Sequence, residues 1–297
     1  MAERESLCRK AEKILRVVGE ARQKSVPARI GFGAGSSSIG INRRALTSKG
    51  DVWLGVNPDG PTDPEVPVVR IDSESGKTFA LLFNYGCHGT SMMSEQITGD
   101  WCGLASQYIE DTWGGDIIAP FLSGAGGDVN PMYNEKKEFD NRTGGADVLA
   151  MMMGEEVISV AKDITPQYNG PVQASQRIVT VPGKQYLGLL GFDPQYDTLA
   201  KDSSPVPDTP LRMSILKVGN VVFAGSSGEI FSEIGMDFKK KSPCQNVVFI
   251  GLCNGYSSYV LSDGEIHRGG YEYNASIVGK GGQAAVINTL LDLVAEL

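Results

Sequence analysis

The chain has 297 residues, of which 41% are hydrophobic and 21% are charged, and its formal net charge at pH 7 is −8. This length can bury a sizeable core, as one large domain or two small ones. The acidic balance and the lack of a basic stripe with interleaved aromatic residues argue against a nucleic-acid partner held by phosphate contacts.

The cysteine pattern and the start of the chain bear on cellular location. Five cysteines form no CxxC pair, and their odd number leaves at least one thiol free, so a reducing compartment is the default interpretation. The N-terminal segment lacks the uninterrupted apolar stretch of a signal peptide, and its apolar residues follow helical spacing at Leu7, Ala11, Ile14, Leu15 and Val18. No window is apolar enough to span a bilayer. We therefore expect a soluble, cytoplasmic protein without an integral membrane segment.

Strand and helix patterns alternate along the chain. In order, the sequence predicts helix 3–24, strands 28–33, 51–56, 67–73 and 78–86, helix 100–113 with Asp100 as N-cap, strand 116–122, a polar loop 127–141 and helix 142–163. It then predicts strand 172–182, an irregular stretch 183–210 typical of an active-site-covering loop, strands 211–219 and 220–226 around a Gly-Asn turn, helix 229–240, strand 246–252, an extended loop 253–277 and helix 278–296. This alternation predicts an α/β layered sandwich with a central mixed β-sheet flanked by helices.

Three strand-like runs end in small residues followed by one side chain that can bind a cation. His88 follows FALLFNYGC, Glu229 follows NVVFAGSSG, and Tyr259 follows NVVFIGLCNGYSS. Open α/β sheets place their ligands at the carboxyl ends of strands. The sequence therefore predicts a metal site built from an imidazole, a carboxylate and a phenol.

Structural interpretations of the same residues remain open. His88 is also typical of a buried, hydrogen-bonded histidine, and Glu229 of a favourable charge at the N-terminus of helix 229–240. Tyr259 and Tyr271 are compatible with core tyrosines whose hydroxyls are hydrogen-bonded. The GAGSSSIG segment lacks both the lysine of a P-loop and the spacing of a nucleophile elbow, which favours a glycine-rich turn.

Several blocks, in a fixed order, carry a family resemblance. NYGCHGTSM, ITGDWCGLASQYIE, FLSGAGGDVNP, GSSGEIFSEIG and VVFIGLCNGYSSYVLSDGEIHRGGYEYNAS together resemble the catalytic domain of the neutral/alkaline, non-lysosomal ceramidases, from about residue 27 to the C-terminus. The resemblance implies a single ceramidase-like hydrolytic domain over residues 1–297, N-terminally truncated relative to the family.

The resemblance also implies roles for individual residues. In these ceramidases two histidines, a glutamate and a tyrosine hold a zinc ion that activates a water for attack on an amide carbonyl. By this resemblance His88 matches the second histidine, Glu229 the glutamate and Tyr259 the tyrosine ligand. Tyr271 matches a tyrosine placed where an oxyanion would develop, and Arg43 matches an arginine near the substrate.

The sequence departs from the family pattern in two places. The first zinc histidine lies in a Thr-His-Thr-His-like segment that has no counterpart here, where only His88 and His267 occur. We therefore expect a Zn²⁺ site that lacks one histidine ligand, and a family member without its N-terminal portion. In GDVNP, Asn130 stands where the family carries serine. Asn130 can donate a hydrogen bond to an oxyanion but cannot act as a nucleophile, and Asp128 and Asn130 are also typical of a turn.

Three hypotheses about function follow. The first is a metal-dependent hydrolase of amide or ester bonds, ceramidase-like and acting as an esterase on small acyl esters, with a small-molecule or lipid-like acyl substrate. The second is a metal-independent serine esterase with His88 or His267 as base and a nucleophile among Ser36, Ser37, Ser91 and Ser227. The third is a non-catalytic fragment with an incomplete zinc site. A missing N-terminal portion should expose apolar core or an unpaired sheet edge, so we also expect a homo-oligomer.

Overall fold

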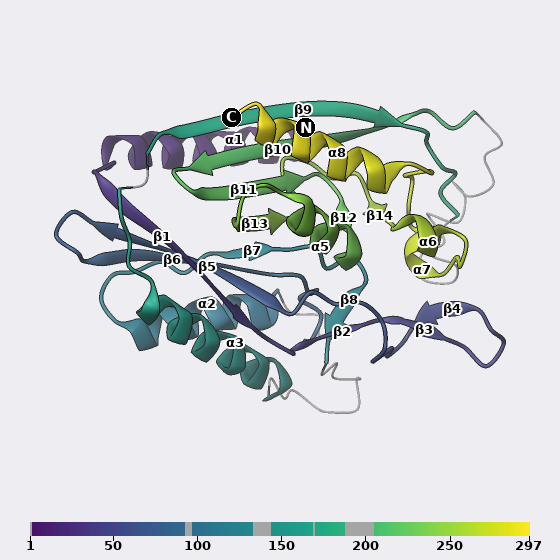
Figure 1. The fold of residues 1–297 in the computed structure, drawn as a ribbon, viewed down its shortest axis with the longest axis horizontal. Helices are drawn as coiled ribbons and strands as arrows, with labels where there is room; N and C mark the ends of the chain where they lie inside the picture. The colour runs from purple at the N-terminus through teal and green to yellow at the C-terminus, as the bar shows by residue number, and fades with distance from the viewer. Residues whose placement is uncertain (1, 93–96, 133–143, 169, 188–204) are drawn as a thin grey trace.

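The computed structural model describes residues 2–92, 97–132, 144–168, 170–187 and 205–297, and Figure 1 shows its layers. Two four-stranded sheets face each other, and each carries helices on its outer face. The predicted α/β layered sandwich with mixed pairing is confirmed. Its strands are divided between two mixed sheets that pack together.

The first sheet carries one wall of the candidate site. Its strand order is β1-β5-β6-β7, antiparallel except for the parallel pair β6 and β7. The strands are β1 (Ala28–Ser36), β5 (Glu65–Ser73), β6 (Thr78–Tyr85) and β7 (Phe121–Ser123). Its outer face packs against α2 (Asp100–Trp113) and α3 (Gly144–Asp163), whose apolar side chains share one buried cluster with the sheet.

The second sheet supplies the opposite wall. Its order is β13-β11-β10-β9, with β11 and β13 parallel and the other pairs antiparallel. The strands are β9 (Val172–Val181), β10 (Thr209–Val218), β11 (Val221–Ser226) and β13 (Asn246–Ile250). Its outer face packs against α5 (Ser232–Lys241) and α8 (Gly282–Ala295).

The inner faces of the two sheets meet over a compact apolar cluster. Ile30 and Val69 from the first sheet pack against Val221 and Val248 from the second, and all four side chains are buried. These strands carry apolar side chains on both faces. Each sheet therefore buries one face against helices and the other against its partner sheet. This packing fixes the strand ends that carry the candidate site.

Short elements near the strand ends complete the fold. Strand β2 (Gly40–Asn42) pairs with β8 (Val129–Pro131), and β12 (Glu229–Ile230) pairs with β14 (Tyr259–Val260). The hairpin of β3 (Arg44–Leu46) and β4 (Val52–Leu54) extends from this region. Two four-residue helices, α6 (Asp263–Ile266) and α7 (Tyr271–Asn274), follow β14.

The structure corrects several predicted elements. Residues Glu229–Ile230 form a strand, so helix 229–240 is wrong at its start, and α5 begins only at Ser232. The predicted loop 253–277 contains β14, α6 and α7, and the predicted strand 116–122 reduces to β7 plus an isolated bridge. Parts of the polar loop 127–141, of the stretch 183–210 and of helix 142–163 lie outside the described residues.

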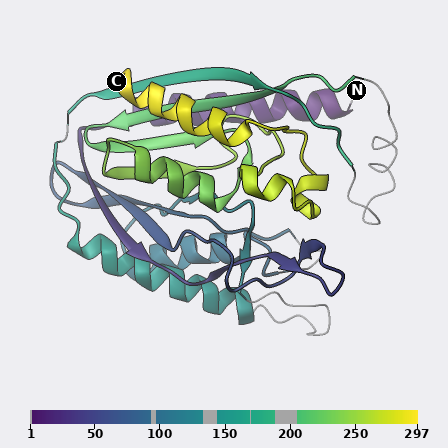
Figure 2. The ribbon, with the colours of Figure 1, turned by 45° about the vertical axis from the view of Figure 1, so that its right-hand side comes forward.

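The N-terminal helix α1 (Ala2–Gln23) stands apart from these layers. Figures 1 and 2 both show it running alongside β9 and β10. Its apolar stripe stays open to solvent, with Ile14, Leu15 and Val18 exposed by 63%, 72% and 60%. Within the described residues, no helix has the length and apolar character required to cross a bilayer.

Candidate active site

Parallel pairing of two short strands places Glu229 beside Tyr259. The two residues are register partners in the β12–β14 ladder, so their side chains leave the same face. Close backbone packing positions this ladder. A Cβ added at Gly127 would lie 2.7 Å from the Glu229 carbonyl oxygen, which explains a glycine in the loop that crosses β12.

His88 lies just beyond the end of β6 and its orientation is fixed by four contacts. Its backbone N–H donates to the Val129 carbonyl at 3.1 Å, and the Trp101 indole donates to the His88 carbonyl at 2.8 Å. Its ring Nδ1 lies 2.9 Å from the same Val129 oxygen, and Nε2 lies 3.0 Å from Oε2 of Glu229. Both ring nitrogens therefore face oxygen atoms.

This arrangement places Nε2 of His88 and Oε2 of Glu229 side by side as a pair of atoms that can share a proton or a cation. The Val129 carbonyl can only accept a hydrogen bond, so it takes the proton on Nδ1. The Glu229 carboxylate is also an acceptor when ionised, and the lone pair of a neutral imidazole would then point at an anion. With the proton on Nδ1, a cation bound by Nε2 and Oε2, or a proton between them, satisfies this contact.

The electrostatics of Glu229 agree with an ionised carboxylate. Burial opposes ionisation, but hydrogen bonds from His88 and Tyr259 and the charge of Arg43 outweigh it and lower the pKa of Glu229 below its ordinary value. The His88 and Glu229 side chains are only 21% and 15% exposed, so water screens their interaction weakly.

Arg43 connects the other predicted residues. Its Nε donates to Glu272 at 2.7 Å and its Nη1 to Oδ1 of Asn130 at 3.1 Å. Its Nη2 donates to the Tyr259 hydroxyl at 3.2 Å and to the Gly127 carbonyl at 2.9 Å. The guanidinium is buried, and although burial opposes its charge, Glu272 raises the pKa of Arg43. A fixed cation thus lies directly beside the candidate metal site.

Tyr271 packs around the same guanidinium. The Arg43 guanidinium carbon lies 5.4 Å from the Tyr271 ring centroid and 5.6 Å from that of Tyr259. The two tyrosine rings meet edge to face with centroids 6.1 Å apart. Burial raises the pKa of both hydroxyls, so both phenols are protonated donors at neutral pH. The structure thus brings together all six sequence-predicted site residues, namely Arg43, His88, Asn130, Glu229, Tyr259 and Tyr271.

The sequence analysis missed the ion pairs that hold Arg43 in place. Glu272 is buried between two arginines, accepting from Nε of Arg43 and, through its other oxygen, from Nη1 of Arg44 at 2.5 Å. Arg44 also donates to Glu265 at 2.7 Å. The adjacent arginines were a signal for such a network, because buried arginines require carboxylate partners.

A cavity of about 130 Å³ opens at His88 and Glu229. Around it lie glycines of the two crossing strand ends and the side chains of Cys87, His88, Cys102, Phe121, Ser123, Glu229 and Leu252. Burial raises the pKa of the Cys87 and Cys102 thiols, so neither is an activated nucleophile. His88 and Glu229 are the groups there that can bind a cation or move a proton.

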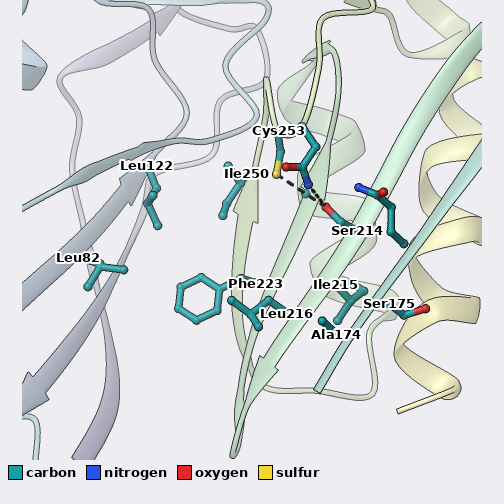
Figure 3. A pocket seen from close by; sticks show the side chains of 13 residues that line it. Leu82, Leu122, Ala174, Ser175, Ser214, Ile215, Leu216, Phe223, Ile250 and Cys253 are labelled. Atoms are coloured by element: carbon teal, nitrogen blue, oxygen red, sulfur yellow. Dashed lines mark hydrogen bonds between the residues drawn. The ribbon is translucent and has the colours of Figure 1, made fainter. Parts of the chain in front are cut away.

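A larger, apolar cavity of about 610 Å³ lies on the other side of the same strand ends (Figure 3). Leu122 of β7 lines it, while its neighbours Phe121 and Ser123 line the small cavity. The wall continues through Leu82, Leu216, Phe223 and Ile250, with a polar group at one end formed by Ser214, Cys253 and Asn254. Among the described residues that line it there is no Asp, Glu or His, and the apolar wall can accommodate an apolar chain.

The geometry bears on both the metal ligands and a serine nucleophile. Among the described residues no three His, Cys, Asp or Glu side chains are grouped so as to hold a metal ion, so His88 and Glu229 need a donor of another kind. Tyr259 is the adjacent oxygen donor. The Ser91 hydroxyl donates to Asp100, and the ring nitrogens of His88 contact Val129 and Glu229 rather than a serine.

Sequence comparison finds no matching family model and no matching curated protein. Comparison of folds finds the neutral ceramidase from Pseudomonas aeruginosa, at a TM-score of 0.74 and 20% identity over 95% of this chain. It also finds a ceramidase complexed with C2, at a TM-score of 0.72 and 20% identity over 91% of this chain. The chain spans about half of each of these proteins, 54% in both cases. At this identity the likeness concerns the fold, and this chain has the layered α/β fold of the neutral ceramidase structures.

Proposed function

We propose that this protein is a metal-dependent hydrolase of amide or ester bonds, of the ceramidase type. The observation that carries the proposal is the 3.0 Å approach of Nε2 of His88 to Oε2 of Glu229, with Nδ1 turned to the Val129 carbonyl. The shared fold with ceramidase structures supports the same conclusion.

The donor set suits zinc. Nε2 of His88, Oε2 of Glu229 and the Tyr259 oxygen would supply three protein ligands, and catalytic zinc sites combine three such ligands with one open position. The contact of Nδ1 with Val129 is the kind of outer bond that orients a metal-binding histidine. Zinc, when bound, would polarise the scissile carbonyl and lower the pKa of a water.

The remaining site residues would act on the substrate. The Tyr271 hydroxyl, held protonated by burial, can donate a hydrogen bond to the oxyanion that forms when the carbonyl is attacked. Arg43 would add positive charge beside that oxyanion, and its bond to Oδ1 of Asn130 leaves the Asn130 amide group free to donate. Glu229 would orient the attacking water through its carboxylate.

The large apolar cavity supports an acyl substrate. It shares β7 and the end of β13 with the small cavity, so an alkyl chain could lie in it while the acyl carbonyl approaches His88 and Glu229. We propose a small-molecule or lipid-like acyl substrate, processed within a single domain over residues 1–297. We also propose a homo-oligomer, in which exposed apolar side chains of α1 are covered.

Hydrolysis of an activated phenyl ester tests the proposal. Such an ester needs less transition-state stabilisation than an amide, so activity should appear first on it. With added zinc, Tyr271→Phe should lower kcat by about 10²–10³-fold, because one oxyanion donor is lost. Tyr108→Phe is the matched control, since its hydroxyl bonds Glu155 at the protein surface and its loss should leave kcat unchanged.

Two outcomes would replace the proposal. If Tyr271→Phe and Glu229→Gln both keep full activity while alanine at Ser36, Ser37, Ser91 or Ser227 abolishes it, the protein is a serine esterase. If the parent chain is inert toward esters and amides in added zinc, it is a non-catalytic protein with an incomplete site.

A further inference from the structure

Tyr256 makes a contact that the proposed mechanism does not use. It lies in the segment between β13 and β14, and its hydroxyl donates to Oε1 of Glu229 at 3.2 Å. His88 binds the other carboxylate oxygen, Oε2. The Glu229 carboxylate is therefore held at both oxygens by side chains from different parts of the chain.

The backbone fixes Tyr256 at this position. On both sides of it, the segment is bonded to the turn that leads into β12. These bonds run from Leu252 to Gly228 at 3.0 Å, from Cys253 to Ser226 at 2.8 Å and from Ser257 to Ser227 at 2.7 Å. The same turn positions Glu229, so the phenol and the carboxylate are held by one rigid unit.

The segment also carries backbone strain. Leu252, Asn254 and Ser258 have φ angles of 53°, 59° and 55°, in the left-handed region that leucine and serine rarely adopt. Such conformations are unfavourable for these residues and persist where the surrounding structure over-determines them, often at functional sites. Here they flank Tyr256, whose hydroxyl contacts Glu229.

We propose that Tyr256 is a positioning residue, whose hydroxyl fixes the Glu229 carboxylate so that Oε2 faces His88 and the metal position. The inference rests on the proposed metal site. A carboxylate held at one oxygen only can rotate and present either oxygen, or both, to a cation. The hydrogen bond at Oε1 removes that freedom and leaves one oxygen for the metal, as outer partners of metal ligands do.

The competing explanation is an ordinary surface hydrogen bond, and the chain offers a matched example of one. Tyr168 is 57% exposed and donates to Glu74 at 2.7 Å, far along the chain from the site residues. Tyr256 is 68% exposed and makes the same kind of bond. Replacing each tyrosine by phenylalanine removes only the hydroxyl. Tyr256→Phe therefore removes a hydrogen bond to the Glu229 carboxylate, and Tyr168→Phe removes one to the Glu74 carboxylate.

Zinc affinity, measured by competition with a chromophoric chelator, is the first test. Tyr256→Phe should weaken zinc binding about 10–100-fold, the usual effect of removing an outer partner of a metal ligand, while Tyr168→Phe should match the parent. Equal affinities for the parent and Tyr256→Phe would overturn the proposal.

A second measurement, on the metal-free protein, tests the positioning role of Tyr256 independently of the proposed metal-dependent function. The chain has only two histidines, so ring ¹⁵N signals of His88 can be compared with those of His267, which lies exposed beside α6. Tyr256→Phe should shift the His88 signals at constant pH and leave those of His267 unchanged. If the parent binds no zinc, the proposed function fails and this measurement alone decides the role of Tyr256. Unshifted His88 signals would then refute it.

Discussion

At the scale of single residues, the site depends on how His88 meets its two acceptors. The Val129 carbonyl takes one ring nitrogen and Glu229 the other, and the Trp101 indole fixes the backbone between them. The nitrogen facing Glu229 is the ring atom that would carry a proton or bind a metal.

The same pair predicts a pH-dependent contribution to stability. Because the folded-state pKa of Glu229 is depressed, its contribution is fully present above the ordinary value of 4.5 and is lost as pH falls through the lower folded value. In metal-free buffer, the parent should therefore exceed Glu229→Gln in unfolding free energy most clearly above pH 4.5. Urea unfolding at a series of pH values should show this difference shrinking on acidification. A difference that stays constant with pH would contradict the ionised pair.

At the scale of elements, local patterns predicted long strands and helices well and short paired segments poorly. Helix 100–113 and strand 172–182 follow periodicity that the sequence displays directly, and the structure has them within a residue. The local sequence at Glu229–Ile230 is typical of a helix start. Pairing with β14, 30 residues later in the chain, makes this segment a strand. Four-residue helices such as α6 and α7 are too short to show a period.

The site residues also divide into those that local sequence patterns predict and those that depend on contacts between distant segments. His88, Glu229 and Tyr259 could be predicted because each follows an apolar run and matches a family motif. Tyr256 and Glu272 could not be predicted, because their roles arise from contacts with partners that lie 27 and 229 positions away along the chain. A single sequence gives no local signal of such distant contacts. Asp100 was predicted as a helix cap; its carboxylate instead accepts from Ser91 and Met92, with φ at 53°.

Helix α1 gives a prediction about assembly. Its apolar stripe and an uncovered apolar stretch of the edge strand β9, with Val172 and Ile178 exposed by 68% and 53%, are surfaces that association would bury. Light scattering should find the parent oligomeric, and Leu15→Glu should shift it toward monomer. Lys13→Glu, on the opposite face of the helix, should leave the oligomer intact. A parent that is monomeric at high concentration would refute the assembly.

At the scale of the whole molecule, the site exists because two sheets end together. His88 follows β6, and Glu229 begins β12 after the turn that ends β11. Tyr256 lies between β13 and β14, and Tyr259 begins β14. Packing of the two sheets over their shared apolar cluster brings these ends to one cavity. The alternation of elements predicted the layers, whereas the division into two facing sheets depends on strand pairing that residue patterns leave open.

Calorimetric titration of the metal-free protein with zinc decides whether His88 marks a metal site. We expect binding of one zinc per chain, abolished in His88→Ala and retained in His267→Ala, the control at the only other histidine. Binding that is absent from the parent, or equally strong in His88→Ala, would contradict it.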